Sequence, residues 1–202
     1  MLKSSEPTTT IFPVTSDNTS NSKAIWVLGI EHVLGGLDHI LFILALALVC
    51  KSSTGLVAPL SAFTLAHSFS LVLVFLGVDI GVPSRLIEVG IAMTIVIMAL
   101  FELLGWKPKR LFLVTAVMGG IHGFGLGQAL TDSMVGVEGL AIALAQVTVG
   151  IELAQLAVAL IFLAVLIHLP KLANVSKKSI ELCTSCVVAC VGFSWMLERL
   201  VS

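Results

Sequence analysis

The sequence predicts an all-α protein, a polytopic bundle of helices that span a membrane. Hydrophobic residues make up 57% of the 202 residues and charged residues only 11%, whereas a soluble domain carries about 25% charged residues. Several apolar stretches reach the length of about 18 residues that indicates a membrane-spanning helix. They lack the alternating pattern of a membrane barrel, and no basic patch suits a nucleic acid. We therefore expect contact with the lipid bilayer and no nucleic acid partner.

The chain divides into a polar tail and one transmembrane domain. Residues 1–23 are polar and rich in Ser and Thr, so we expect a disordered tail rather than a signal peptide. Residues 24–202 are predicted to form one domain of about six helices, or seven if residues 24–37 re-enter the membrane as a separate piece. The six predicted spans cover approximately residues 24–50, 58–78, 84–105, 110–130, 138–168 and 178–201.

The first span carries the same acid–histidine pair twice, seven residues apart. Glu31-His32 is followed by Asp38-His39, and seven residues is nearly two helical turns, so both histidines share one face. Imidazole and carboxylate are ligands of zinc, nickel and iron, and ionisable groups are costly inside a membrane. We therefore predict metal or proton chemistry here, in preference to hydrogen bonds that only join helices. Two consecutive glycines between the pairs permit a kink or a break, a feature of transporter substrate sites.

The second and third spans contribute one further candidate ligand. In the second, Thr64, His67 and Ser68 are three or four residues apart and reach one interface. Hydroxyl groups commonly mediate helix packing, whereas a histidine in mid-span needs a partner. In the third span, which begins after Pro83, we expect Glu102 to lie at the water interface close to Lys107.

The fourth span is rich in glycine. Gly119, Gly123 and Gly127 form a ridge of small residues that lets a neighbouring helix approach closely. His122 lies beside this ridge and is expected near the packed centre of the bundle, where it is a candidate ligand.

The fifth and sixth spans hold a carboxylate and a row of thiols. Glu152 is surrounded by apolar residues, and an unpaired carboxylate there is expected to be protonated or to need a cation. His168 lies at the end of the fifth span and is read as interfacial. On the last span, Cys183, Cys186 and Cys190 share one face, and we predict that they pack as small residues rather than bind a soft metal.

The distribution of basic residues predicts the orientation. With six spans, the end that carries more Lys and Arg is expected to face the cytoplasm, which places both termini outside it. We therefore expect a multi-pass protein of the inner (plasma) membrane. The richer end holds Lys51, Lys107, Lys109, Arg110, Lys171, Lys177 and Lys178, and the other end holds Lys3, Lys23, Arg85 and Arg199.

Four segments, in this order, resemble the HupE/UreJ family of small bacterial membrane proteins. They read Gly29-x-Glu31-His32-x-x-x-Gly36-x-Asp38-His39, Ala62-Phe63-Thr64-x-Ala66-His67-Ser68, Ile121-His122-Gly123-Phe124-Gly125 and Gly150-x-Glu152-x-x-Gln155. The resemblance implies a membrane protein linked to the nickel enzymes hydrogenase and urease, and a permease for nickel or a related metal. The candidate ligands that fall in family motifs are His32, Asp38, His39, His67, His122 and Glu152.

Three functions are compatible with these residues. The favoured one is a secondary permease for a divalent transition-metal ion, namely nickel, cobalt or zinc, since no nucleotide-binding motif is present. The alternative is an intramembrane zinc-dependent hydrolase that activates water, with Glu31 or Glu152 as general base. Haem binding by two facing histidines is less favoured because axial ligation does not need the neighbouring carboxylates. The sequence leaves the oligomeric state open, and a homo-oligomer is one option.

Overall fold

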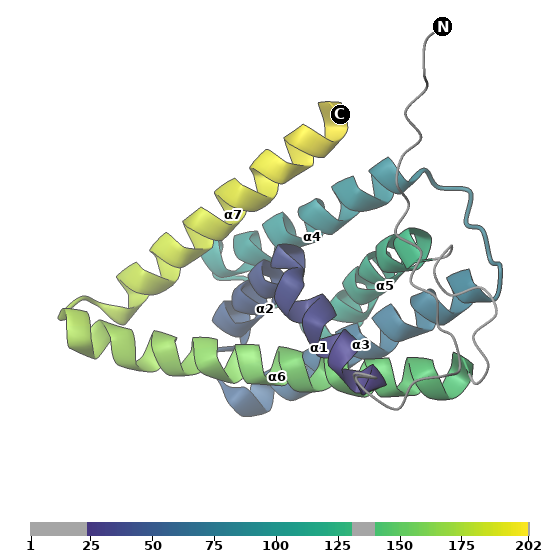
Figure 1. The fold of residues 1–202 in the computed structure, drawn as a ribbon. Coiled ribbons are helices and arrows are strands. Elements are labelled where there is room, and N and C mark those ends of the chain that lie inside the picture. The colour runs from purple at the N-terminus through teal and green to yellow at the C-terminus, as the bar shows by residue number, and fades with distance from the viewer. Residues whose placement is uncertain (1–23, 131–139, 202) are drawn as a thin grey trace, which may run out of the picture.

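The computed structural model describes residues 24–130 and 140–201, so the prediction of a disordered tail concerns residues outside the described part. The described residues form helices joined by short connections and contain no strand (Figure 1). The helices are α1 (Ile25–Gly35), α2 (Leu37–Cys50), α3 (Ser53–Phe75), α4 (Ser84–Leu103), α5 (Leu111–Leu130), α6 (Leu140–Ala173) and α7 (Lys177–Val201).

The helices have the length and composition of a membrane bundle, as the sequence predicted. Among the described residues, α3, α4, α6 and α7 are long and apolar enough to cross a bilayer. The pair α1 and α2 passes the same test together, and α5 is a shorter apolar helix. The helical membrane bundle is thus confirmed, while the count of six spans stays a prediction. Large apolar side chains such as Leu65, Phe69 and Val117 are exposed on the outside, where lipid tails would cover them.

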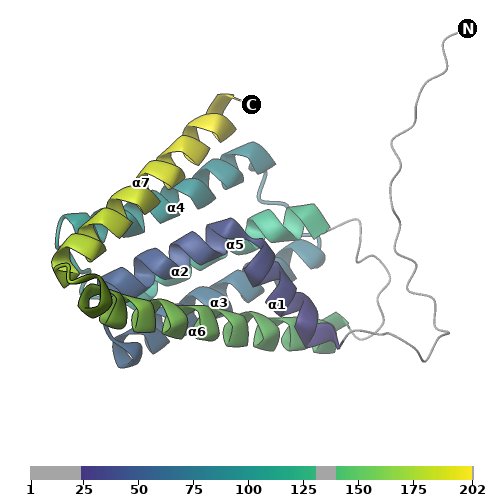
Figure 2. The ribbon, with the colours of Figure 1, turned by 60° about the vertical axis from the view of Figure 1, so that its left-hand side comes forward.

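The first predicted span is broken rather than continuous. α1 and α2 meet at Gly36, which has an extended backbone, and their axes differ by 75°. The Gly36 N–H donates to the His32 carbonyl, so the first helix ends there with its last turn closed. This break confirms the expectation from the consecutive glycines, and it turns α1 aside to lie across α6 (Figure 2).

Two helix pairs approach so closely that only glycine fits at the contact. Where α5 meets α3, a Cβ on Gly123 would lie 2.9 Å from the His67 Cα and still closer to its carbonyl oxygen. Gly119 meets Phe63 on α3 in the same way, which confirms the predicted ridge. Where α1 crosses α6, a Cβ on Gly150 would overlap the Trp26 carbonyl oxygen. These contacts fix α1 against α6 and α5 against α3.

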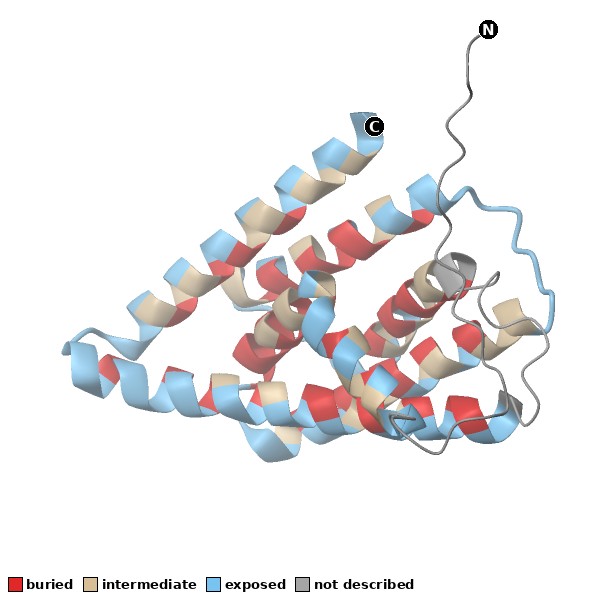
Figure 3. Ribbon diagram, in the orientation of Figure 1, coloured by how far each residue is buried: buried red, intermediate tan, exposed pale blue. Residues whose placement is uncertain are grey.

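The core lies around α2, which is the most buried helix. Ala45, Leu46 and Leu48 are fully buried, and buried residues line the inward faces of the surrounding helices (Figure 3). Burying the second half of the broken span in this way holds its first turn, with His39, at a fixed place inside the bundle.

The charged groups gather at opposite ends of α2. At the end where α2 stops, the Lys51 ammonium lies 2.8 Å from Glu102 and 3.2 Å from Glu181. The hydrogen bond to Glu102 raises the pKa of Lys51 above its usual 10.5. Glu102 was expected beside Lys107, but its described ion pair is with Lys51. We call this the Lys51 end. At the other end, where α2 begins, Arg199 contacts Asp38, and we call this the Arg199 end.

Candidate metal centre

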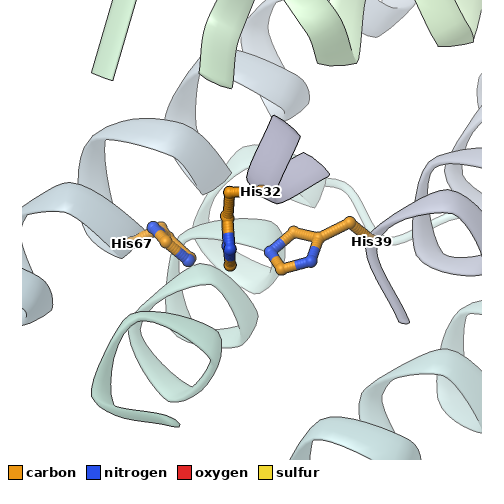
Figure 4. A group of neighbouring side chains, drawn as sticks. All are labelled: His32, His39 and His67. Carbon is orange, nitrogen blue, oxygen red and sulfur yellow. The ribbon is translucent and has the colours of Figure 1, made fainter. Parts of the chain in front are cut away.

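Three histidines from three helices converge at the Arg199 end. His32 lies in the last turn of α1, His39 in the first turn of α2 and His67 within α3. Each offers a ligand atom, and these atoms all lie within 4.8 Å of one another. Figure 4 shows the three rings side by side, with a nitrogen of His67 and one of His39 directed toward His32.

The helix break brings the first two histidines together. In a straight helix, residues seven apart are separated by about 10 Å along the axis. Because the chain bends at Gly36, the ring centroids of His32 and His39 are only 4.6 Å apart. His67 completes the group, with ring centroids 5.8 Å from His32 and 5.6 Å from His39.

A fourth imidazole, that of His122 on α5, lies next to this group. Its ring centroid is 5.3 Å from that of His39, and its side chain is buried. We call His32, His39, His67 and His122 the histidine cluster.

The Thr94 hydroxyl determines which nitrogen of His122 is free. This hydroxyl donates to the Ile91 carbonyl at 2.7 Å and lies 2.9 Å from Nε2 of His122. A hydroxyl has one proton, so the bond to His122 is one in which Nε2–H donates to the Thr94 oxygen. The Nδ1 of His122 then carries a lone pair, and it has no hydrogen-bond partner among the described residues. A metal ligand oriented by its second nitrogen has this arrangement.

Most other imidazole nitrogens of the cluster are also buried without a partner. Among the described residues, both nitrogens of His39 and of His67 and the Nε2 of His32 lack a hydrogen bond. Leaving a buried polar group unpaired costs about 1–3 kcal/mol. A bound metal ion would satisfy several of these lone pairs at once.

Two phenylalanines close the cluster on the side that faces the Lys51 end. Phe42 and Phe63 are fully buried and stack with ring centroids 4.5 Å apart. Phe63 lies 5.1 Å from the ring of His122 and 6.0 Å from that of His67. This apolar floor separates the cluster from the charged groups at the Lys51 end.

The two predicted carboxylate ligands have other partners. Asp38 accepts from Arg199, with the guanidinium nitrogen 3.1 and 3.3 Å from its two oxygens. Glu152 accepts a hydrogen bond of 2.6 Å from the Ser61 hydroxyl. Sequence reasoning expected Glu152 to be protonated or to need a cation, and the structure places a hydroxyl beside it. Neither carboxylate belongs to the group of converging ligands in the described part of the chain.

The hydrogen bond between Ser61 and Glu152 is one of a row of polar contacts between α3 and α6. Thr64 donates to Gln155 at 2.9 Å, and Thr148 donates to Ser68 at 2.9 Å. These bonds match the expectation that the hydroxyl groups of α3 share one interface, and they fix the helix that carries His67.

The remaining predicted residues lie away from the cluster. His168 is exposed on α6, which continues to Ala173, beyond the expected end of the fifth span, so its placement at the water interface stays a prediction. Cys183, Cys186 and Cys190 are exposed on α7, so the predicted packing role is not seen among the described residues.

Sequence reasoning did not assign a role to Thr94 or to Arg199. Thr94 is a hydroxyl in the apolar middle of α4, and Arg199 lies 161 residues from its partner. Nothing local to either residue indicates the contact.

Comparisons with known proteins place the whole chain in one family. Neither the curated proteins nor the solved structures include a significant match. The sequence profile described as HupE / UreJ protein, however, matches residues 9–199, nearly the full length. The order of motifs noted in the sequence is thereby accounted for, and the chain belongs to the HupE/UreJ family.

Proposed function

We propose that the protein carries a divalent transition-metal ion across the membrane, and that the histidine cluster binds the ion in transit. The family is associated with nickel and cobalt transport, so these two ions are the preferred substrates, with zinc as the third candidate. The bundle of apolar helices supplies the membrane-embedded frame that such a role requires.

One observation carries this proposal: ligand atoms of His32, His39 and His67 lie within 4.8 Å of one another. Imidazole nitrogens suit nickel, cobalt and zinc, whereas magnesium and calcium prefer oxygen ligands. Two of the three rings flank the break of a broken span, which is where transporters build substrate sites. Three such ligands leave coordination positions open, and an ion held this way can be released again.

The roles of the other predicted ligands follow from their positions. We propose that His122 takes over the ion from the first three histidines, because its ring lies beside that of His39 and its Nδ1 has no hydrogen-bond partner among the described residues. Asp38 is the carboxylate next to the cluster, and its part in ion entry is developed below. The proposed role of Glu152 as a ligand has no contact in the structure that supports it.

We also propose an orientation. The Lys51 end holds most of the basic residues and would face the cytoplasm of a bacterial inner membrane, with the Arg199 end and both termini outside. An ion arriving from outside would then meet the histidine cluster before the apolar floor of Phe42 and Phe63.

The test is nickel binding to the purified full-length chain, followed by uptake into sealed vesicles. We expect micromolar or weaker, readily reversed binding of nickel or cobalt, lost in His67→Ala and retained in the exposed His168→Ala control. We expect nickel uptake by vesicles that contain the parent protein and not by those that contain His67→Ala. Absence of binding in the parent would refute the proposal. One zinc per chain that does not exchange, without uptake, would instead favour the hydrolase.

A further inference from the structure

We propose that Arg199 is a latch that holds the Asp38 carboxylate when no metal is bound and thereby closes the entrance to the histidine cluster. The inference rests on the proposed transport function and adds a residue that controls ion entry.

The burial of the side chains defines the entrance. The side chains of Asp38 and Arg199 are 25% and 23% exposed, whereas His39, the residue after Asp38, is buried. His32, at the end of α1, is half-buried. An ion from the water at the Arg199 end would thus meet Asp38 before it reached the buried histidines His39, His67 and His122. The Arg199 guanidinium is already hydrogen-bonded to that carboxylate. Its positive charge repels an approaching cation.

The Arg199 guanidinium has contacts that do not involve Asp38. Its Nη1 donates to the Glu88 carbonyl at 3.0 Å, and the guanidinium lies 5.7 Å from the centre of the Trp195 ring. Only Nη2 contacts the carboxylate. A small rotation could therefore release Asp38 while the contacts with α4 and Trp195 persist, which keeps the open state accessible.

Attachment of α7 does not require the contact with Asp38. Arg85 donates to the carbonyl oxygens of Arg199 and Leu200, which ties the end of α7 to the start of α4. Further along α7, Gly192 is buried against Ile95 of α4. The contact of Arg199 with Asp38 on α2 is thus not needed to hold α7 against α4. Closing the entrance at Asp38 is a role that explains this contact.

The ion and the guanidinium would compete for one carboxylate. Asp38 lies in the first turn of α2, where the helix dipole already favours a negative charge. When a divalent ion binds Asp38 beside His39, the guanidinium is displaced toward Glu88 and the water. The ion then enters together with the negative charge of Asp38, which compensates its own. The entrance therefore opens only when an ion binds.

The test measures how fast the cluster histidines react with diethyl pyrocarbonate in the metal-free, full-length protein. The chain has five histidines, so in a His168→Gln background, purified through a histidine-free tag, the reaction reports the cluster alone. Modification is followed by mass spectrometry. We expect Arg199→Gln to speed the reaction about fivefold, the scale of a partly exposed ion pair. Arg199→Lys should lie in between, because it keeps the charge but not the planar donor group.

Two matched variants separate a latch from a loosened helix. Arg85→Gln removes the other contacts at the end of α7 and should leave the reaction rate close to that of the parent. Asp38→Asn should speed the reaction as much as Arg199→Gln, and the double variant should add nothing further. An unchanged rate in Arg199→Gln, or an equal rise in Arg85→Gln, would overturn the latch.

A second measurement places the latch on the path of the ion. The association rate of nickel should rise in Arg199→Gln by the same factor as the reaction with diethyl pyrocarbonate. If only the latter rises, Arg199 covers the cluster without controlling ion entry, and the proposal fails. If the parent binds no nickel, the transport function fails instead, and the reactivity still decides whether Arg199 closes the cluster.

Discussion

Substituting Gly123 by alanine tests whether the close contact of α3 and α5 builds the metal centre. The new Cβ would lie 2.9 Å from the Cα of His67 and 2.8 Å from its carbonyl carbon, while ordinary contact begins at 3.4 Å. The obstacle is backbone, so no side-chain rotation relieves it. The two helices would have to separate by more than about 1 Å to restore normal contact with the His67 carbonyl group.

The magnitude follows from two opposing terms. Alanine in place of glycine inside a helix stabilises by about 0.5–1 kcal/mol. Overpacking costs about 1–3 kcal/mol, and a backbone obstacle lies at the upper end of that range. We expect a net loss of about 2 kcal/mol of unfolding free energy in Gly123→Ala. Nickel affinity should also fall, because His67 and His122 lie on the two helices that are pushed apart.

Gly120 provides the control on the same helix. A Cβ there would meet the Ser70 hydroxyl at 3.4 Å, which is ordinary contact. Gly120→Ala should therefore keep its affinity and gain up to about 1 kcal/mol from helix propensity. The assay is unfolding of the purified protein by increasing dodecyl sulfate, followed by tryptophan fluorescence, together with a nickel titration. Equal stability and equal affinity of the two variants would refute the argument.

Three further predictions concern the cluster and the Lys51 end. Thr94→Val removes the oxygen that orients His122 and should weaken nickel binding about tenfold in a titration; Thr94→Ser should restore it, and an unchanged valine variant would contradict the assignment of the free Nδ1. Gly36→Ala places a Cβ 2.8 Å from Nδ1 of His39 and should weaken binding, whereas Gly35→Ala meets nothing within 4 Å and should not; equal affinities would show that the ring has room to move. Because the folded state raises the pKa of Lys51, its ion pairs stabilise the fold below the usual pKa of 10.5, and this contribution is lost as the pH rises through the raised value. Lys51→Gln should remove that part of the pH dependence in unfolding measurements, and a variant with the parent's profile above pH 10.5 would disprove it.

The helices and their close contacts could be predicted because their signals are local. Apolar length indicates the spans, and small residues at every fourth position indicate the ridge that Gly119 and Gly123 form against α3. The consecutive glycines indicated a break between the two acid–histidine pairs. The angle of that break was not predictable, since it depends on how α1 packs across α6 through Gly150.

In the candidate site, too, the features with a local signal could be predicted and those set by distant segments could not. Its histidines could be named because an imidazole is rare and costly within an apolar helix. The partners of the carboxylates could not, because they come from distant segments: Asp38 contacts a residue 161 positions away, and Glu152 one 91 positions away. The sequence around Ser61 or around Arg199 carries no local sign of such a contact. Reasoning from the sequence therefore assigned both carboxylates to the metal, whereas the fold gives them protein partners.

The separation of the carboxylate from the histidines has a consequence for how strongly the ion is held. An ion bound only by neutral imidazoles keeps its full charge in an apolar surrounding, which costs free energy unless a counter-charge lies nearby. If Asp38 were fixed in the cluster, the compensated ion would be held tightly and would leave slowly. Under the proposed latch, a carboxylate shared with Arg199 would neutralise part of the charge on entry and return to the guanidinium once the ion moves toward His122. Exchangeable binding is what transport requires of a site, and in the proposed function the competing cation Arg199 would keep Asp38 from holding the ion tightly.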